Sequence, residues 1–317
     1  MPATPVISLD SISHRYGDRL ALDAVSLSVV SGEIFGLLGP NGSGKTTLFR
    51  LLATLLPFQS GTATIGGANV ASEPGLVRKR IGITFQSPSL DPKLTVRENL
   101  VCQGRLYGLS GPRLAGRIDE LTSQLDLSDR LADRAETLSG GLKRRVEVAK
   151  SLLHSPEVLL LDEPSTGLDP GIRHDLWRTL RDLVRSRGLT ILVTTHLLDE
   201  AENCSRLAIL DQGRVVAQGT PDELRRTVGG DCITISTGEP EVLANEIEAA
   251  CATPVQRMDD QLRIERAGGH ELVRDLMVRF GDRMRSITLG RPTLEDVFIH
   301  ATGRRLTAEK PASRHTH

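Results

Sequence analysis

The stretch GPNGSGKTT, residues 39–47, constrains the fold of this chain more than any other. It matches the pattern GxxxxGK[ST], in which glycines let the backbone approach phosphate groups closely. The apolar run EIFGLLG leads into it, and the amphipathic run TLFRLLATLL follows it. We therefore predict a strand, a phosphate-binding loop and a helix in that order, because the strand aims the loop and the helix N-terminus faces the phosphates.

Every residue of this loop is a candidate for binding a nucleotide. We expect Lys45 to reach the terminal phosphates and the Thr46 hydroxyl to take a position beside Mg²⁺. The expected phosphate-binding residues are Gly39, Pro40, Asn41, Gly42, Ser43, Gly44, Lys45, Thr46 and Thr47. A purely structural glycine turn is the alternative, and the strand and helix on either side argue against it.

Two carboxylates end a second apolar run, VLLLDEP at residues 158–164. Asp162 is suited to hold Mg²⁺ through water, and Glu163 is suited to polarise the attacking water as a general base. The alternative is that one of them caps a helix. The phosphate loop upstream favours the metal and proton-transfer roles.

Three more polar side chains stand near the ends of predicted strands. His196 closes TTH after the strand LTILVTT, where an imidazole can contact a phosphoryl oxygen or hold the catalytic carboxylate and water in line. Gln86 ends RIGITFQ, so its amide can contact Mg²⁺ or water, and Tyr16 in SHRYGDRLAL can stack on a purine ring. A packing histidine, an ordinary strand-end amide and a turn tyrosine are the respective alternatives.

A second helix start suited to an anion lies in LSGGLKRRVEVAKSLL, residues 138–153. Because the loop at residues 39–47 already serves the phosphates of one nucleotide, this second start raises the question of what it binds. A glycine-rich turn that opens a surface helix is the alternative.

Hydrophobic periodicity predicts an α/β fold with a mostly parallel sheet. ISLDSIS and VSLSV alternate as strands near the N-terminus, whereas about residues 87–155 hold helical patterns only and form a predicted helical subdomain. Strand-like runs then return at EVLLLD, LTILVTT and RLAILD, alternating with the helical HDLWRTLRDLVRSR and HLLDEAE. We expect this first domain to span residues 1–222.

The remaining chain predicts a second, smaller α+β domain at residues 223–304. After a helical ELRRTV, the order of patterns is strand, helix, two strands, helix and strand, which suggests a ferredoxin-like fold. A last helix, TLEDVFIHA, follows, and we expect residues 305–317 to be a disordered tail.

Composition excludes several classes of protein. The 39 Lys and Arg balance 40 Asp and Glu to a net charge of −1, and only 3% of residues are aromatic, so a nucleic-acid partner is not expected. The four cysteines form no CxxC pair, which gives no sign of zinc or disulfides. The N-terminus lacks a signal-peptide pattern and no run of about 18 apolar residues occurs, so we expect neither secretion nor a membrane span.

Together and in this order, these stretches resemble the ATP-binding-cassette (ABC) ATPases over residues 5–222. The resemblance implies a P-loop ABC cassette, with N-terminal antiparallel strands and a helical insert, that binds ATP and Mg²⁺. It makes LSGG the family's signature, so Ser139, Gly140 and Gly141 cap a nucleotide held by a partner copy, and it puts Asp169 at the dimer seam. The family's usual Gln after LSGG is Leu142 here, which removes a polar contact expected near the partner's ribose.

The resemblance also implies partners and a location. Two copies sandwich two ATP molecules head to tail at the cytoplasmic face of the membrane, and a groove beside the helical insert receives a short helix from a separate permease subunit. Five residues either line that groove or form the core of the insert: Leu90, Leu94, Val96, Leu100 and Tyr107.

The segment RPTLEDVFIHATGR, residues 291–304, resembles the C-terminal extension of daunorubicin-type resistance exporter ATPases. This implies the ATP-hydrolysing subunit of an exporter, whose cargo (drug, lipid or polysaccharide) the sequence leaves open. The alternative is a soluble ABC ATPase of an assembly or repair complex without transport.

Overall fold

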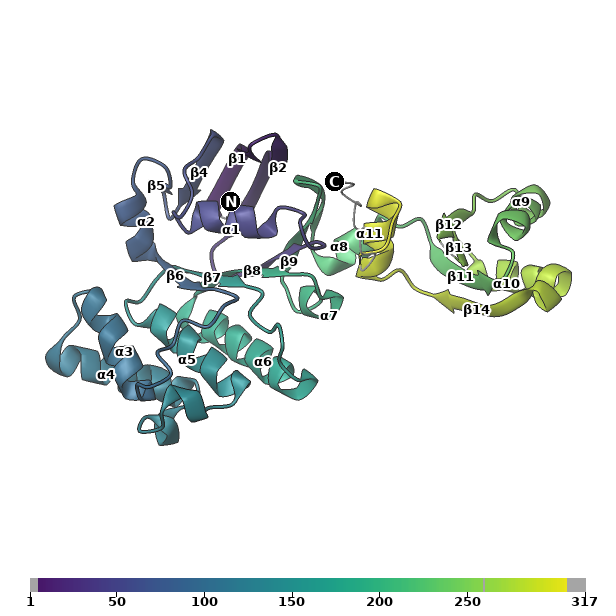
Figure 1. Cartoon of the computed structure of the whole chain (residues 1–317). Coiled ribbons are helices and arrows are strands. Elements are labelled where there is room, and N and C mark those ends of the chain that lie inside the picture. The colour runs from purple at the N-terminus through teal and green to yellow at the C-terminus, as the bar shows by residue number, and fades with distance from the viewer. Residues whose placement is uncertain (1–4, 259, 307–317) are drawn as a thin grey trace, which may run out of the picture. The chain divides into compact units, whose positions relative to one another are not determined.

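The computed structural model describes residues 5–258 and 260–306, and it divides into two compact units between Val215 and Val216 (Figure 1). The boundary expected from the sequence, at residue 222, lies further along the chain. Of the expected disordered tail, residues 307–317 fall outside the described residues.

The first unit begins with an antiparallel sheet. Its strands are β1 (Pro5–Tyr16), β2 (Arg19–Val30), β4 (Ser60–Ile65) and β5 (Ala68–Asn69), in the order β2-β1-β4-β5. β1 and β2 form a hairpin in which Tyr16 pairs with Arg19, and the turn passes through Gly17 at φ 56°. The alternation of buried and exposed residues along β1 and β2 is the pattern of strands with one face on a core.

A second sheet in this unit holds five parallel strands. They are β3 (Ile34–Leu38), β6 (Ile81–Thr84), β7 (Val158–Asp162), β8 (Thr190–Thr195) and β9 (Arg206–Asp211), in the order β9-β3-β8-β7-β6. Every residue of β3, β7 and β8 is buried, which explains the consecutive apolar residues in IFGLL of β3, VLLL of β7 and ILV of β8. β10 (Arg214–Gly219) follows β9 and carries the chain across the division.

Alternate residues of these strands face two separate hydrophobic clusters. Leu160 and Leu192 pack in the cluster that contains α1 (Lys45–Leu52), whereas Leu159 and Ile191 pack in the other. The second cluster contains residues of α3 (Val96–Leu106), α4 (Gly111–Gln124), α5 (Gly140–Leu152) and α6 (Pro170–Arg187). In Figure 1, α1 accordingly lies on one face of the sheet and α5 and α6 lie on the other.

The helical insert contains α3, α4 and α5, at the positions where the sequence predicts helices. Thr95 starts α3 with a capping box, since its hydroxyl accepts from the Glu98 N–H and the Glu98 carboxylate accepts from the Thr95 N–H. Two 3₁₀ turns, η1 (Ser128–Arg130) and η2 (Ala135–Thr137), connect α4 to α5. The remaining helices of this unit are α2 (Pro74–Arg80) and α7 (Leu198–Ala201).

The second unit has its own four-stranded antiparallel sheet. Its elements follow the order β11 (Asp231–Thr237), α9 (Pro240–Cys251), β12 (Gln256–Met258), β13 (Gln261–Arg266), α10 (Gly269–Phe280), η3 (Gly281–Arg283) and β14 (Met284–Gly290). The strand order is β12-β13-β11-β14, and residues of β11, β13, α9 and α10 share one hydrophobic cluster.

Two more helices belong to this unit, α8 (Pro221–Arg226) and α11 (Leu294–Thr302). The side chain of Arg263 on β13 is almost fully buried and donates to Glu265 at 2.9 Å and to Asp296 on α11. This charge pairing attaches α11, in the segment TLEDVFIHA, to the sheet.

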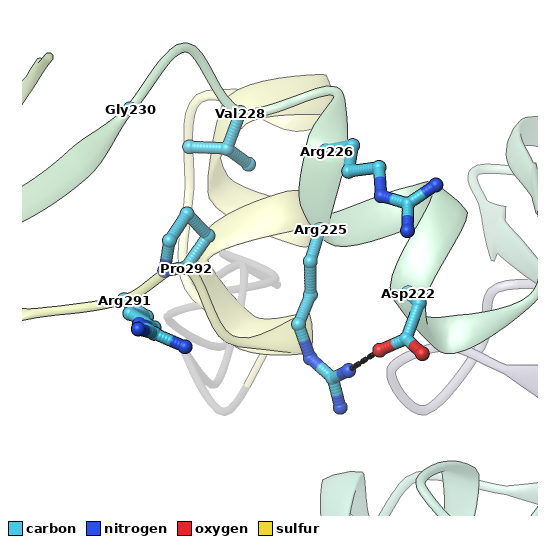
Figure 2. Close-up of a pocket in the computed structure, with 7 residues that line it drawn as sticks. All are labelled: Asp222, Arg225, Arg226, Val228, Gly230, Arg291 and Pro292. Atoms are coloured by element: carbon cyan, nitrogen blue, oxygen red, sulfur yellow. Dashed lines mark hydrogen bonds and ion pairs between the residues drawn. The ribbon is translucent and has the colours of Figure 1, made fainter.

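A pocket of about 480 Å³ also lies in this unit (Figure 2). It is lined by Asp222, Arg225, Arg226, Val228, Gly230, Arg291 and Pro292.

Gly82 on β6 allows a direct test of the packing of α5 against the sheet. A Cβ at this position would overlap the backbone oxygen of Ser151. We expect Gly82→Ala to lower the free energy of unfolding by about 1–3 kcal/mol, because backbone has to shift. Urea unfolding followed by the fluorescence of Trp177, the single tryptophan and a buried residue of α6, measures this.

Gly75→Ala on α2 is the matched control, because a Cβ there meets nothing within 4 Å. We expect it to leave stability unchanged or to raise it by roughly 0.5–1 kcal/mol, as Ala replaces Gly in a helix. Equal unfolding midpoints for the two variants would contradict the packing described for Gly82.

Candidate functional site

The loop between β3 and α1 has a backbone path that only glycine permits. A Cβ on Gly39 would overlap the backbone oxygen of Leu210, and Gly44 has φ 110°, in the left-handed region. The Lys45 ammonium lies within this loop and donates to the carbonyl oxygens of Gly39 at 2.7 Å and Pro40 at 3.1 Å. The predicted phosphate loop therefore has the strand, loop and helix order that its motif requires.

The remaining residues of the loop present polar groups at the start of α1. Asn41, Gly42 and Thr46 are exposed, and Thr47 is half-buried. The buried Ser43 Oγ has no hydrogen-bond partner among the described atoms. A helix N-terminus with an unpartnered hydroxyl and no acidic residue in its first turn is suited to bind phosphate.

Three predicted residues converge on the carboxylate of Glu163. Gln86 donates from Nε2 to Oε2 at 3.3 Å, His196 Nδ1 lies 3.2 Å from Oε1 without hydrogen-bond alignment, and Lys45 Nζ lies 3.8 Å from Oε1. The hydroxyl of Thr166 also donates to Oε2 at 3.2 Å. These contacts leave the Glu163 side chain only 11% exposed. The carboxylate thus lies between a cation, an amide and an imidazole.

The backbone of Glu163 is strained. Its φ is 44°, a left-handed conformation that costs a non-glycine residue about 1–3 kcal/mol. Its N–H is held by Thr194, which accepts at the carbonyl oxygen (3.2 Å) and at Oγ1 (3.0 Å). Strain that is held in place in this way is typical of a functional residue.

Asp162 is the last residue of β7 and is buried, and it accepts a hydrogen bond from Thr194 Oγ1 at 2.6 Å. Burial raises the pKa of Asp162, and the charge of Glu163 raises it further, while Thr194 and Lys45 oppose the rise. Burial also lowers the pKa of Lys45, against the attraction of the two carboxylates.

The donor set at this end of the sheet fits Mg²⁺. The Asp162 carboxylate, the Thr46 hydroxyl and the Gln86 amide all offer oxygen, the ligand atom that Mg²⁺ prefers. A divalent cation would also offset the repulsion between Asp162 and Glu163, which raises the pKa of Asp162.

Ser139, Gly140 and Gly141 lie apart from this cluster. Ser139 caps α5, and its hydroxyl accepts from the Leu142 N–H at 3.4 Å. α5 and α1 lie on opposite faces of the sheet (Figure 1). Within residues 5–258 and 260–306, no hydrogen bond or ion pair joins these three residues to the loop at 39–47. Asp169 is the N-cap residue of α6, and its side chain makes no capping hydrogen bond.

Tyr16, the residue expected to stack on a purine, lies at the end of β1. It is 45% exposed, and its ring and the His14 ring form a T-shaped contact at a centroid distance of 4.8 Å. Its hairpin partner Arg19 has a guanidinium nitrogen 3.4 Å from the position of a Cβ on Gly42. The β1–β2 hairpin therefore lies beside the phosphate loop.

The residues expected at the permease groove divide into two groups. Val96 and Leu100 are fully buried in α3 and belong to the core of the insert. Leu90 and Leu94 are half-buried, and the half-exposed Tyr107 stacks on His154 at a ring distance of 3.8 Å.

Sequence reasoning missed a link from α5 to Gln86. The buried Arg144 donates to the carbonyl oxygens of Phe85 at 2.7 Å and Gln86 at 3.2 Å, and it pairs with Glu147 at 2.8 Å. Glu147 in turn accepts from the Ser89 N–H at 2.6 Å. The only sequence pattern that could have indicated this link is an Arg and a Glu three residues apart on one helix. Such pairs usually lie on the surface, so the pattern did not point to a buried contact.

The fold and the cluster define a P-loop nucleotide-hydrolysing protein, and the comparisons with known proteins specify which kind. The family model described as "ABC transporter" matches residues 22–166. The daunorubicin resistance ATP-binding protein DrrA2 of Streptomyces coeruleorubidus is 41% identical, over 94% of this chain and 95% of that protein. The Nod factor export ATP-binding protein I of Burkholderia lata is 40% identical, over 96% and 99%.

Two solved structures agree with this assignment. An ATP-binding subunit of an ABC transporter has a TM-score of 0.63 at 32% identity and covers 71% of this chain and 93% of that one. The ADP conformation of the ATP-binding cassette MJ1267 has a TM-score of 0.65 at 28% identity and covers 71% and 95%. The chain belongs to the ATP-binding proteins of the ABC transporter family, which hydrolyse ATP.

Among its described residues, no helix is both long and apolar enough to cross a bilayer.

Glu163→Gln separates hydrolysis from binding. The amide keeps the size of the side chain but cannot accept a proton, so we expect hydrolysis to slow by roughly 10² to 10⁴ while ATP binding is kept. A phosphate-release assay and binding of a fluorescent ATP analogue measure the two effects. Glu157→Gln, just before β7 at its other end, is the control and should hydrolyse ATP at the native rate. Near-native turnover of Glu163→Gln would remove this residue from the role of base.

Proposed function

We propose that this chain is the ATP-hydrolysing subunit of an exporter and works beneath a separate membrane permease. Relatives named for daunorubicin resistance and for Nod factor export match nearly the whole chain, including the second unit. Their names support export, and the proposed cargo is a drug, a lipid or another small molecule. The chain would then act at the cytoplasmic face of the membrane, where its insert meets the permease.

In the proposed mechanism, each residue near the phosphate loop has a distinct part. The loop amides and Lys45 bind the phosphates of ATP, and Glu163 takes a proton from the attacking water. Gln86 and His196 hold that water and the carboxylate in line. Asp162, Thr46 and Gln86 would hold Mg²⁺, which supplies positive charge to the phosphate oxygens when it is bound.

The position of α5 supports a dimeric site. Ser139, Gly140 and Gly141 open a helix on the sheet face opposite α1, so within one copy they do not complete the loop at residues 39–47. In a head-to-tail pair, these residues of each copy would cap the ATP held by the other, with Asp169 at the seam. ATP would then favour the closed pair and ADP the open one, because ADP lacks the γ-phosphate that both copies contact.

Mixing two inactive variants tests this arrangement. Lys45→Ala loses phosphate binding and Ser139→Arg blocks the cap, so neither should hydrolyse ATP alone. A mixed pair has one site in which both defects meet and one site free of either. We therefore expect an equal mixture to regain roughly a quarter of native hydrolysis, since half of the pairs are mixed and each has one intact site.

The control mixes Lys45→Ala with Glu163→Gln, two changes in the same half of the site, and should regain almost nothing. Equal recovery in both mixtures, or no recovery in the first while both variants fold and pair, would contradict the shared site. Hydrolysis by Ser139→Arg alone would contradict the role of the cap.

A further inference from the structure

Glu200 is a buried carboxylate whose two oxygens contact two different segments of the first unit, the loop after β7 and the end of β8. It belongs to α7 and is 1% exposed. The Ser165 hydroxyl donates to Oε1, and the Thr195 hydroxyl donates to Oε2 at 2.6 Å. Arg173 Nε lies 3.8 Å from Oε1. Burial raises the pKa of Glu200, while Thr195 and Arg173 oppose that rise.

The two hydroxyl donors flank the proposed catalytic residues. Ser165 belongs to the loop that begins at Glu163, and Thr195 directly precedes His196. The carbonyl oxygen of Thr195 also accepts from the Gly39 N–H at 3.2 Å, so this strand end is joined to the phosphate loop. Through these two hydroxyls, one carboxylate joins the segments on both sides of the Glu163–His196 pair.

The segments that Glu200 joins carry the two side chains whose positions should matter most for the rate of hydrolysis, Glu163 and His196. Glu163 and His196 are 3.2 Å apart, and Glu163 has the strained backbone that only its surroundings can hold. A shift of about 1 Å in a catalytic group can cost roughly 10²-fold in rate. A buried carboxylate is itself unfavourable unless its oxygens are bonded, so Glu200 and its hydroxyl donors fix one another.

We propose that Glu200 is a positioning residue for ATP hydrolysis, which holds the loop of Glu163 against the strand end of His196 by accepting the hydroxyls of Ser165 and Thr195. The inference rests on the proposed function, because Glu200 acts here only through Glu163 and His196. We therefore expect a change at Glu200 to lower the rate of the chemical step of hydrolysis. Binding of ATP depends instead on Lys45 and the glycine loop.

The first test compares kcat with KM in the purified full-length protein. We expect Glu200→Ala to lower kcat by roughly 10- to 100-fold and to leave KM for ATP within about twofold. Glu200→Gln keeps one oxygen acceptor and should fall between the native protein and Glu200→Ala. Glu33→Gln is the matched control, since Glu33 is similarly buried and accepts from the Val30 N–H at 2.8 Å, but lies at the amino end of β3. It should retain native kcat.

The second test repeats Glu200→Ala in the Glu163→Gln background, with single-turnover hydrolysis of radiolabelled ATP. If Glu200 acts by placing Glu163, the second change should cost less than about twofold there. The same loss in both backgrounds, or a rise in KM with native kcat, overturns the inference. Should Glu200→Ala not fold, Glu200→Gln provides the same comparison.

Failure of the base role that the proposed function gives to Glu163 would look different from failure of this inference. It would appear as near-native turnover of the Glu163→Gln variant, both with Glu200 and with Ala at position 200. That result would also contradict the inference about Glu200.

Discussion

Thr194 on β8 holds both acidic residues at the end of β7. Its hydroxyl donates to Asp162, and the N–H of Glu163 donates to both its hydroxyl and its carbonyl oxygen. These bonds keep Glu163 in its left-handed conformation and aim the carboxylate toward Lys45 and His196. The roles proposed for Asp162 and Glu163 depend on this junction between two neighbouring parallel strands.

The sheet that provides the junction also separates the two halves of the proposed dimeric site. Its central strands are buried on both faces, because α1 packs on one side and α5 on the other. Arg144 of α5 nevertheless holds the backbone at Gln86, whose amide contacts Glu163. The helix that begins at Gly140 is therefore bonded to the segment that contacts the Glu163 carboxylate.

The sequence predicted the central elements and placed Gln86, Glu163 and His196 each near the end of its own strand. The structure brings them together, since carboxyl ends of parallel strands meet at one edge. It did not predict β4, β5 or α2, which are short and carry little apolar periodicity. Thr194 and Glu200 were missed for a different reason. Their roles arise from side-chain contacts between distant segments, which leave no local pattern.

The central claim is that ATP itself joins two copies of this chain. The most direct measurement is the mass of the Glu163→Gln protein in solution, by analytical ultracentrifugation with ATP and then with ADP. Our account predicts a dimer with ATP, a monomer with ADP, and a monomer in both when Ser139→Arg is added. A monomer in saturating ATP, or a dimer that does not depend on the nucleotide, would contradict it.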